Sequence, residues 1–383
     1  MEFVTLLEKE FRQFADKHPD KSFFQTPEIA HLRQQNGWIP YYFGVKQNRK
    51  IVAATMVVAK PTFLGKSTFY APGGPLVDYE DAKLLTFFVK NLKNYMKHHN
   101  GYVFHIDPYY ELIQRDRDGK VVSGGFDHTK AALNLKSLGF KPLPISEQPK
   151  YLFILDLNGH TPDELFASFK QNTRNLISRT SRNGVKVREL EREELPVFKA
   201  ITEATSERRH FTDKTLRYYE QMYDLFHDKG EVKFIVAEVS EDTLSRSVFG
   251  DGPNMERPSP VTTGARERSE KDVSLIPLSA AMFMTYGDEV LYLFSGSDKK
   301  YMKEYNAQYA IQWHMIKYAA EHGFKRYNFY GIQGLPDPKS PGYGIYKFKK
   351  GFGGRVVELL GSYELPLSSL YYLHSFLSKL RHH

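Results

Sequence analysis

Apolar and polar positions follow the same order of elements twice along the chain, strand, strand, strand ending in a glycine turn, helix, strand. The first copy is predicted to have strands at 40–46, 51–59 and 67–75, a helix at 81–101 and a strand at 102–108. The second copy is predicted to have strands at 232–239, 277–286 and 289–297, a helix at 306–323 and a strand at 325–332. A repeated order of this kind predicts two copies of one α/β unit.

These copies give the expected domain boundaries, with a first unit at 1–156 and a second at 157–383. Thr161 and Glu164 have the spacing of a capping box, so a helix is predicted to begin there. An insertion at about 240–274 is rich in proline, glycine and charge and has no apolar period. It is therefore predicted to be a mobile loop of the second unit.

The last predicted strand, "RYNFYGI", carries polar groups where a buried strand would have Val, Ile or Leu. Such a strand end, like the glycine turns "APGGP" and "FSGS", is a place where ligands gather in α/β units. Period-two alternation predicts that Asn328 and Tyr330 line a cleft while Phe329 faces inward. The alternative is a strand whose tyrosines simply reach the surface.

The composition excludes several kinds of catalytic and binding site. The 383 residues include no cysteine, which excludes disulfides, thiolate metal sites and a cysteine nucleophile. The formal charge of +8 fits either a polyanion-binding protein or a lysine-rich surface. The start of the chain lacks the order of a signal peptide, and the longest apolar run, 51–59, is too short to span a bilayer. The expected location is cytoplasmic.

Four basic residues lie close together in the predicted helical region that begins near Thr161. This group is either a footprint for phosphate or tRNA, or an ordinary solvated helix face. Its members are Lys170, Arg174, Arg179 and Arg182.

The order of elements is similar to the fold of the GCN5-type N-acyltransferases (GNAT). Members that use acetyl-CoA carry an Arg/Gln-x-x-Gly-x-Gly/Ala loop that holds pyrophosphate on backbone amides. Neither copy has this loop; the second has "SGSDKKYMKEYNAQ" in its place. If acyl transfer is the chemistry, the acyl donor is therefore not expected to be a coenzyme A thioester.

Several ordered motifs resemble the Fem aminoacyltransferases (FemABX), the non-ribosomal peptidyltransferases that build peptidoglycan cross-bridges. They are "YAPGGPLVDY", "YNAQYAIQW", "RYNFYGI", "YKFKKGF" and "ELLGSYELPL". The resemblance implies an α/β fold of tandem GNAT-like units, each a mixed sheet flanked by helices. It implies transfer of Ala, Ser or Gly from aminoacyl-tRNA to a stem-peptide amine of lipid II or UDP-MurNAc-pentapeptide, with no metal or dissociable cofactor.

The residues agree with that chemistry. Both substrates are phosphate-rich, which gives the basic surplus a use. The donor is an activated ester, so the enzyme need not supply a nucleophile, and the chain has neither cysteine nor a Gly-x-Ser-x-Gly elbow.

The resemblance also implies site residues. Arg33, Lys214 and Tyr218 correspond to groups that meet the acceptor, although the related position has arginine where Lys214 stands. Tyr292 matches an aromatic of the cleft, and Phe348 and Lys349 lie at the reacting centre. Lys349 is expected to stabilise the anionic tetrahedral intermediate.

Three positions depart from the family pattern. Phe294 replaces a tyrosine, and Gln308 replaces a proline. The proline- and glycine-rich insertion stands where many relatives have a long helical arm.

The acceptor amine must lose a proton, because the pKa of a lysine side chain is near 10.4. Asp107 in "HIDP" is the candidate general base; a substrate phosphate or the tRNA ribose is the alternative. His105 and His210 are expected to be packing or surface groups.

Two other functions fit the same sequence. One is a non-catalytic module that binds lipid II or tRNA, and the other is a tRNA-dependent transferase that acts on another amine. The C-terminal stretch 367–381 is apolar at helical intervals, which predicts packing on the second unit or a peripheral contact with the inner membrane face.

Overall fold

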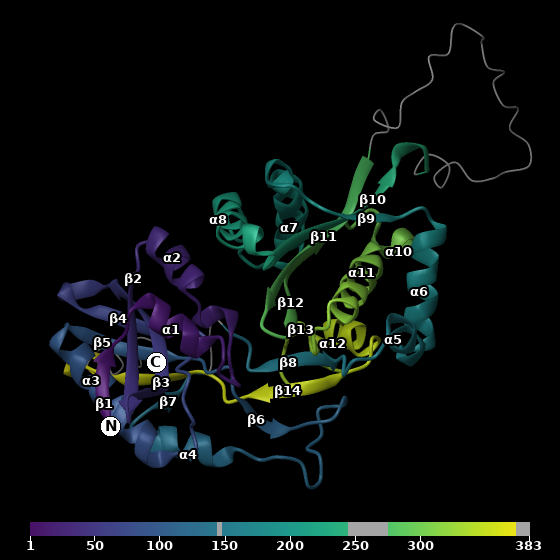
Figure 1. The fold of residues 1–383 in the computed structure, drawn as a ribbon. Coiled ribbons are helices and arrows are strands. Elements are labelled where there is room, and N and C mark those ends of the chain that lie inside the picture. The colour runs from purple at the N-terminus through teal and green to yellow at the C-terminus, as the bar shows by residue number, and fades with distance from the viewer. Residues whose placement is uncertain (144–147, 244–274, 373–383) are drawn as a thin grey trace, which may run out of the picture. The chain divides into compact units, whose positions relative to one another are not determined.

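The computed structural model describes residues 1–143, 148–243 and 275–372 (Figure 1). The chain forms two mixed α/β units, which confirms the expected class. Unit 1 comprises the described residues of Met1–Asp156, Tyr286–Glu289 and Asn328–His383, and unit 2 those of Leu157–Thr285 and Val290–Tyr327. The boundary predicted between residues 156 and 157 separates two copies of one fold, whereas the units above are compact groups of residues. The predicted boundary therefore stays a prediction. The predicted mobile loop lies almost wholly outside the described residues, as does the C-terminal stretch beyond residue 372.

Unit 1 is built on a seven-stranded sheet in the order β1-β2-β3-β4-β5-β15-β7. Strands β4 and β5 are parallel and the other neighbours antiparallel. Helix α3 (Ala82–His98) begins where Asp81 accepts hydrogen bonds from two backbone N–H groups, and its apolar face packs into the sheet's core. The strands are β1 (Glu2–Thr5), β2 (Ile39–Gln47), β3 (Lys50–Pro61), β4 (Ser67–Ala71), β5 (Gly101–Ile106), β7 (Lys141–Pro142) and β15 (Tyr363–Pro366).

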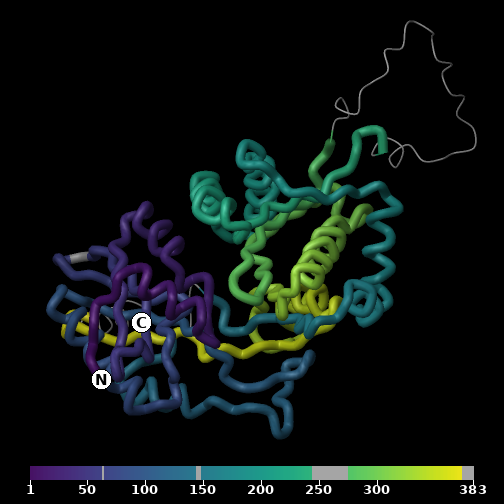
Figure 2. Tube along the Cα trace, viewed as in Figure 1, coloured from purple at the N-terminus to yellow at the C-terminus, as the bar shows by residue number. Residues whose placement is uncertain are grey.

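The end of the chain completes this sheet. Strand β15 pairs with β5 on one side and β7 on the other, and Figure 2 shows the yellow C-terminal trace beside the purple N-terminal strands. Unit 1 also contains β6 (Glu111–Gln114), β14 (Arg355–Leu359) and β8 (Tyr151–Asp156), in that antiparallel order. Glu358 on β14 is buried and forms ion pairs with Arg115 and Lys150. Such a buried carboxylate would be costly without its partners.

Unit 2 contains β12 (Glu289–Ser297), β11 (Leu275–Tyr286), β10 (Val232–Ser240) and β9 (Lys186–Glu189), in that order. Figure 1 shows α7 (Leu195–Arg209) and α8 (Leu216–Phe226) on one side of these strands and α11 (Ala307–Glu321) on the other. The predicted capping box is confirmed: Thr161 caps α5 (Pro162–Ser168), and its backbone N–H donates to Glu164 at 2.8 Å. The remaining helices are α6 (Gln171–Arg182) and α10 (Met302–Tyr305).

The "FSGS" turn has a packing role. A Cβ atom added to Gly296 would lie 2.4 Å from the carbonyl oxygen of Ile201 on α7. A glycine there lets a helix backbone approach the strand closely.

Replacing Gly296 with alanine is therefore expected to lower the free energy of unfolding by about 1–3 kcal/mol, because backbone atoms must move apart. Chemical denaturation measures this. Gly344→Ala is the matched control, since a Cβ there meets nothing within 4 Å and helix α12 (Tyr343–Lys350) favours alanine. Equal stability of both variants would show that the approach at Gly296 is not restrictive.

Candidate active site

Arg33 and Asp107 belong to one group of side chains in unit 1. Arg33, on α2 (Pro27–Gln35), places its guanidinium carbon 5.4 Å from the ring centre of Tyr70 and 5.7 Å from that of Trp38. The Tyr70 hydroxyl donates to one oxygen of Asp107, and the N–H of Gly73 donates to the other at 2.6 Å. Asp107 thus connects the basic residue, through Tyr70, to the glycine turn.

The glycine turn is held from its other side by Gln25. This completely buried side chain donates to the carbonyl oxygens of Met56 and Pro72 at 3.0 and 2.8 Å. A Cβ at Gly74 would lie 2.6 Å from the Gln25 side chain, so the turn has no room for one. Asp107 is 4% exposed, and both its oxygens accept hydrogen bonds within the unit. This geometry favours a positioning role for Asp107, and its role as general base stays a prediction.

The polar strand end that the sequence singled out, β13 (Arg326–Ile332), has its hydrogen bonds inside the protein. Asn328 is completely buried and donates to the Tyr109 hydroxyl at 3.1 Å and to Glu289 at 3.2 Å. Phe329 is completely buried, as expected of the inward-facing residue, and Asn328 is completely buried as well. The Asn328 side chain also accepts the N–H of Tyr330 at 2.7 Å, and Tyr330 has a left-handed φ of 64°. A ligand-facing role for Asn328 and Tyr330 stays a prediction.

Tyr330 and Lys349 lie at the end of this strand. Tyr330 is half-buried, and its hydroxyl donates to Gln148. Lys349, on α12, is 5% exposed and donates to the carbonyl oxygen of Gly331 at 2.6 Å. It forms no ion pair within the described part of the chain, and burial lowers its pKa to about 7. Phe348 is half-buried and packs edge-on against Phe352.

A residue that the sequence did not single out joins these two groups. Tyr109 follows Asp107 by two positions, and its N–H donates to Gly73 at 3.4 Å. Its hydroxyl donates to Glu289 at 2.7 Å and accepts from Asn328. Unit 1 therefore contains one continuous network from Arg33 to the strand end beside Lys349. A signal for Tyr109 was its place directly after the "HIDP" strand exit.

The remaining predicted residues lie in unit 2. Lys214 is exposed just before α8, and its Nζ lies 5.4 Å from the ring centre of Tyr218, which packs edge-on against Phe294. Tyr292 donates to Ser295 and, at 3.3 Å, to Gln308, and burial raises its pKa to about 12. Gln308 thus supports Tyr292 by a hydrogen bond.

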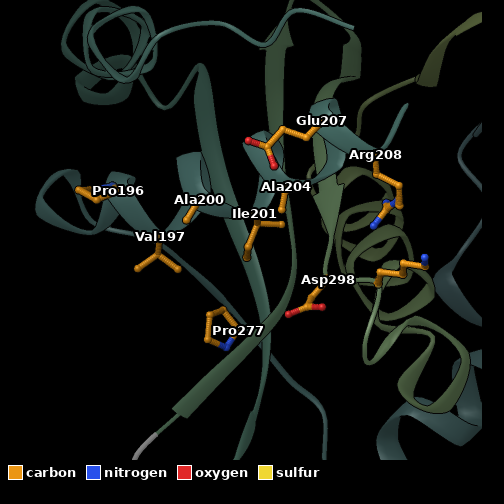
Figure 3. Close-up of a pocket in the computed structure, with 10 residues that line it drawn as sticks. Pro196, Val197, Ala200, Ile201, Ala204, Glu207, Arg208, Pro277 and Asp298 are labelled. Atoms are coloured by element: carbon orange, nitrogen blue, oxygen red, sulfur yellow. The ribbon is translucent and has the colours of Figure 1, made fainter. Parts of the chain in front are cut away.

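A pocket of about 840 Å³ opens along α7 in unit 2. Figure 3 shows the apolar side chains of Val197, Ala200 and Ile201 on its wall, with Glu207 and Arg208 further along the helix. It contains none of the predicted site residues. An apolar wall of this kind does not suit a phosphate.

The described residues contain no cluster of three or more histidine, aspartate or glutamate side chains that could hold a metal ion. Likewise, none of the helices in the described ranges has the length and apolar character needed to cross a bilayer.

The model of the FemAB family matches residues 6–250 and 255–379. The chain belongs to the FemAB family. It is 29% identical to aminoacyltransferase FemA of Staphylococcus aureus strain bovine RF122 / ET3-1, over 100% of this chain and 99% of that protein, and the FemA of strain N315 matches equally. The expected enzyme class, an aminoacyltransferase, is thereby confirmed.

Two solved structures are similar to this chain. The crystal structure of FemX is similar to this chain with a TM-score of 0.76 and 22% identity, over 97% of this chain and 99% of that one. A tandem GNAT protein from the clavulanic acid biosynthesis pathway matches with a TM-score of 0.49 and 12% identity, over 96% and 98%. The likeness to FemX shows that the two share a fold.

Proposed function

We propose that this aminoacyltransferase moves an alanyl, seryl or glycyl group from aminoacyl-tRNA to the stem-peptide amine of lipid II or UDP-MurNAc-pentapeptide, in building the peptidoglycan interpeptide bridge. The observation that carries the proposal is Lys349, a buried lysine in the "YKFKKGF" motif that has a backbone carbonyl, not a carboxylate, as its partner. No carboxylate of the described ranges pairs with it, so its charge is available to a negatively charged group.

The reaction needs one anion to be stabilised. The acceptor amine attacks the ester carbonyl carbon of the donor, and the carbonyl oxygen becomes negatively charged in the tetrahedral intermediate. The ammonium group of Lys349 stabilises this oxygen in a site largely closed to water. The intermediate collapses when the ribose oxygen of the tRNA leaves, and the amine proton passes to the leaving ribose or to a substrate phosphate.

Arg33 is suited to the diphosphate of the acceptor. Its guanidinium lies against Tyr70 and Trp38, so part of the entropic cost of ordering the side chain is met before a ligand arrives. Arginine in this arrangement can grip two phosphate oxygens. Lys214, Tyr218 and Tyr292 in unit 2, and Tyr330 and Phe348 in unit 1, are also proposed to contact the substrates. The enzyme is proposed to act at the inner membrane face, where lipid II would lie.

Mass spectrometry tests the proposal. Purified protein is incubated with a mixture of charged tRNAs and with lipid II or UDP-MurNAc-pentapeptide. A mass increase of one aminoacyl residue on the acceptor is expected, and the size of the increase identifies the amino acid. Binding of both substrates without that increase would instead indicate a binding module. Transfer to a competing amine in preference to the stem peptide would indicate another acceptor.

A further inference from the structure

Helix α6 lies in a stretch of unit 2 that has no acidic residue. Between Glu164 and Glu189 the sequence contains no aspartate or glutamate. The same stretch carries six basic residues, Lys170, Arg174, Arg179, Arg182, Lys186 and Arg188. A solvated helix face usually alternates charges of both signs. In this stretch, all the charged side chains are positive.

Two of these arginines already have structural partners. Arg174 donates to the carbonyl oxygens of Ala167 and Phe169, at 2.8 and 2.6 Å, and so satisfies the end of α5. Arg188 forms ion pairs with Glu194 and Glu238, both at 2.8 Å. Neither arginine is therefore available to a ligand.

Arg179 and Arg182 differ from them. Both are exposed, and neither forms an ion pair with any residue of the described ranges. Among the described residues, Arg182 donates to the backbone oxygen of Ser178, at 3.4 Å. The side of α6 that packs on α11 buries Thr173, Ile177 and Thr180. The outer side presents Asn172, Asn175, Ser178, Arg179 and Arg182.

A second basic segment adjoins the C-terminal end of α6. Asn183, the residue that ends the helix, donates to the carbonyl oxygen of Glu304 on α10 at 3.2 Å. The loop that leads into α10 exposes Lys299 and Lys300, and α10 itself exposes Lys303. Acids occur at the border of this region, at Asp298 and Glu304 and at Glu241 and Asp242.

We propose that the α6 surface, formed by Arg179, Arg182, Lys300 and Lys303, binds the phosphate backbone of the tRNA donor; the inference rests on the proposed function. Unpaired cations attract a polyanion and release its counterions. Amide and hydroxyl groups beside them suit hydrogen bonds to phosphate and ribose. An anionic membrane is disfavoured because every fully exposed residue of α6 is polar or charged, so none of them would insert among lipids.

The test compares two double variants with the same loss of charge. Arg179→Gln/Arg182→Gln removes the helix contribution to the α6 surface. Lys130→Gln/Lys136→Gln is the control, on exposed positions of α4 (Thr129–Ser137) in unit 1. Binding of deacylated tRNA is measured by fluorescence anisotropy between 50 and 200 mM salt. The first variant is expected to bind at least about tenfold more weakly, with a log–log salt slope lower by about two. The control is expected to bind as the wild type does.

The remaining outcomes separate this inference from the proposed function. With aminoacyl-tRNA as donor, the arginine variant should raise the KM for the donor and leave that for the acceptor unchanged. If the arginine variant binds tRNA as tightly as the wild type and still transfers the aminoacyl group, the proposed role of the α6 surface is wrong and the proposed function stands. The expected loss of tRNA binding in a protein that transfers nothing would support the surface and overturn the function. Loss of flotation with phosphatidylglycerol vesicles, without loss of tRNA binding, would assign the surface to lipid and overturn the inference.

Discussion

Replacing Lys349 with methionine is expected to lower kcat/KM for transfer by about 10²–10³-fold, the usual cost of removing one group that stabilises an oxyanion. Methionine has a similar length and no charge, so the buried site stays filled. Lys347→Met is the matched control, because Lys347 lies on the same helix but is exposed, with its Nζ 5.9 Å from the ring centre of Tyr343. Normal transfer by Lys349→Met would contradict the proposed mechanism.

The Lys349→Met substitution should lower activity but not the free energy of unfolding. Burial lowers the pKa of Lys349 from 10.5 to about 7 in the folded protein. The unfolded chain therefore binds more protons between these two pH values, and folding stability rises with pH across that window. The cost of burying the ammonium is greatest below pH 7. Lys349→Met is accordingly expected to match or exceed the wild type in free energy of unfolding, and by most below pH 7, in chemical denaturation at several pH values.

The same pKa gives the role of Lys349 a test in the pH profile. If the ammonium stabilises the intermediate, kcat/KM falls as the pH rises through about 7, because the free enzyme loses the proton. A rate that instead rises through this value and is flat in Lys349→Met would make the neutral amine a proton acceptor. That result would overturn the electrostatic role while keeping the residue in the site.

The elements of both copies could be predicted because apolar periodicity is a local property. The predicted helix at 81–101 corresponds to α3 at Ala82–His98, and the strand at 289–297 to β12 with the same bounds. The position of β15 could not be predicted in this way. Its partners, β5 and β7, lie more than 200 residues earlier in the chain, and nothing in four residues of strand specifies such a pairing.

The site was predicted less completely, for the same reason. Asn328 was expected to face a ligand, yet its partners Tyr109 and Glu289 lie 219 and 39 positions away. Their hydrogen bonds make burial of an amide acceptable, and no local pattern encodes them. Lys349 shares its sequence surroundings with Lys347 and Lys350, and only the family resemblance distinguished it. Its burial, which gives it a depressed pKa, depends on the tertiary structure.

Replacing Asp107 with asparagine is expected to lower the free energy of unfolding by about 2–4 kcal/mol. The buried carboxylate accepts hydrogen bonds from the Tyr70 hydroxyl and the Gly73 N–H. An amide has one acceptor oxygen, so one of these donors is left unsatisfied and faces an NH₂ group. Tyr70→Phe is the companion variant, because it removes one donor and keeps the ring beside Arg33. The two losses should not add, since they share one hydrogen bond.

The kinetics of Asp107→Asn then separate positioning from proton transfer. A positioning role predicts a raised KM for the acceptor, because Arg33 rests against Tyr70, with kcat reduced less than about tenfold. Tyr70→Phe should raise the same KM. If Asp107 were the general base, kcat would fall by about 10²–10⁴-fold in a variant that remains folded, and Tyr70→Phe would leave kcat nearly intact. The two hydrogen bonds that fix the carboxylate between Tyr70 and Gly73 favour the first result.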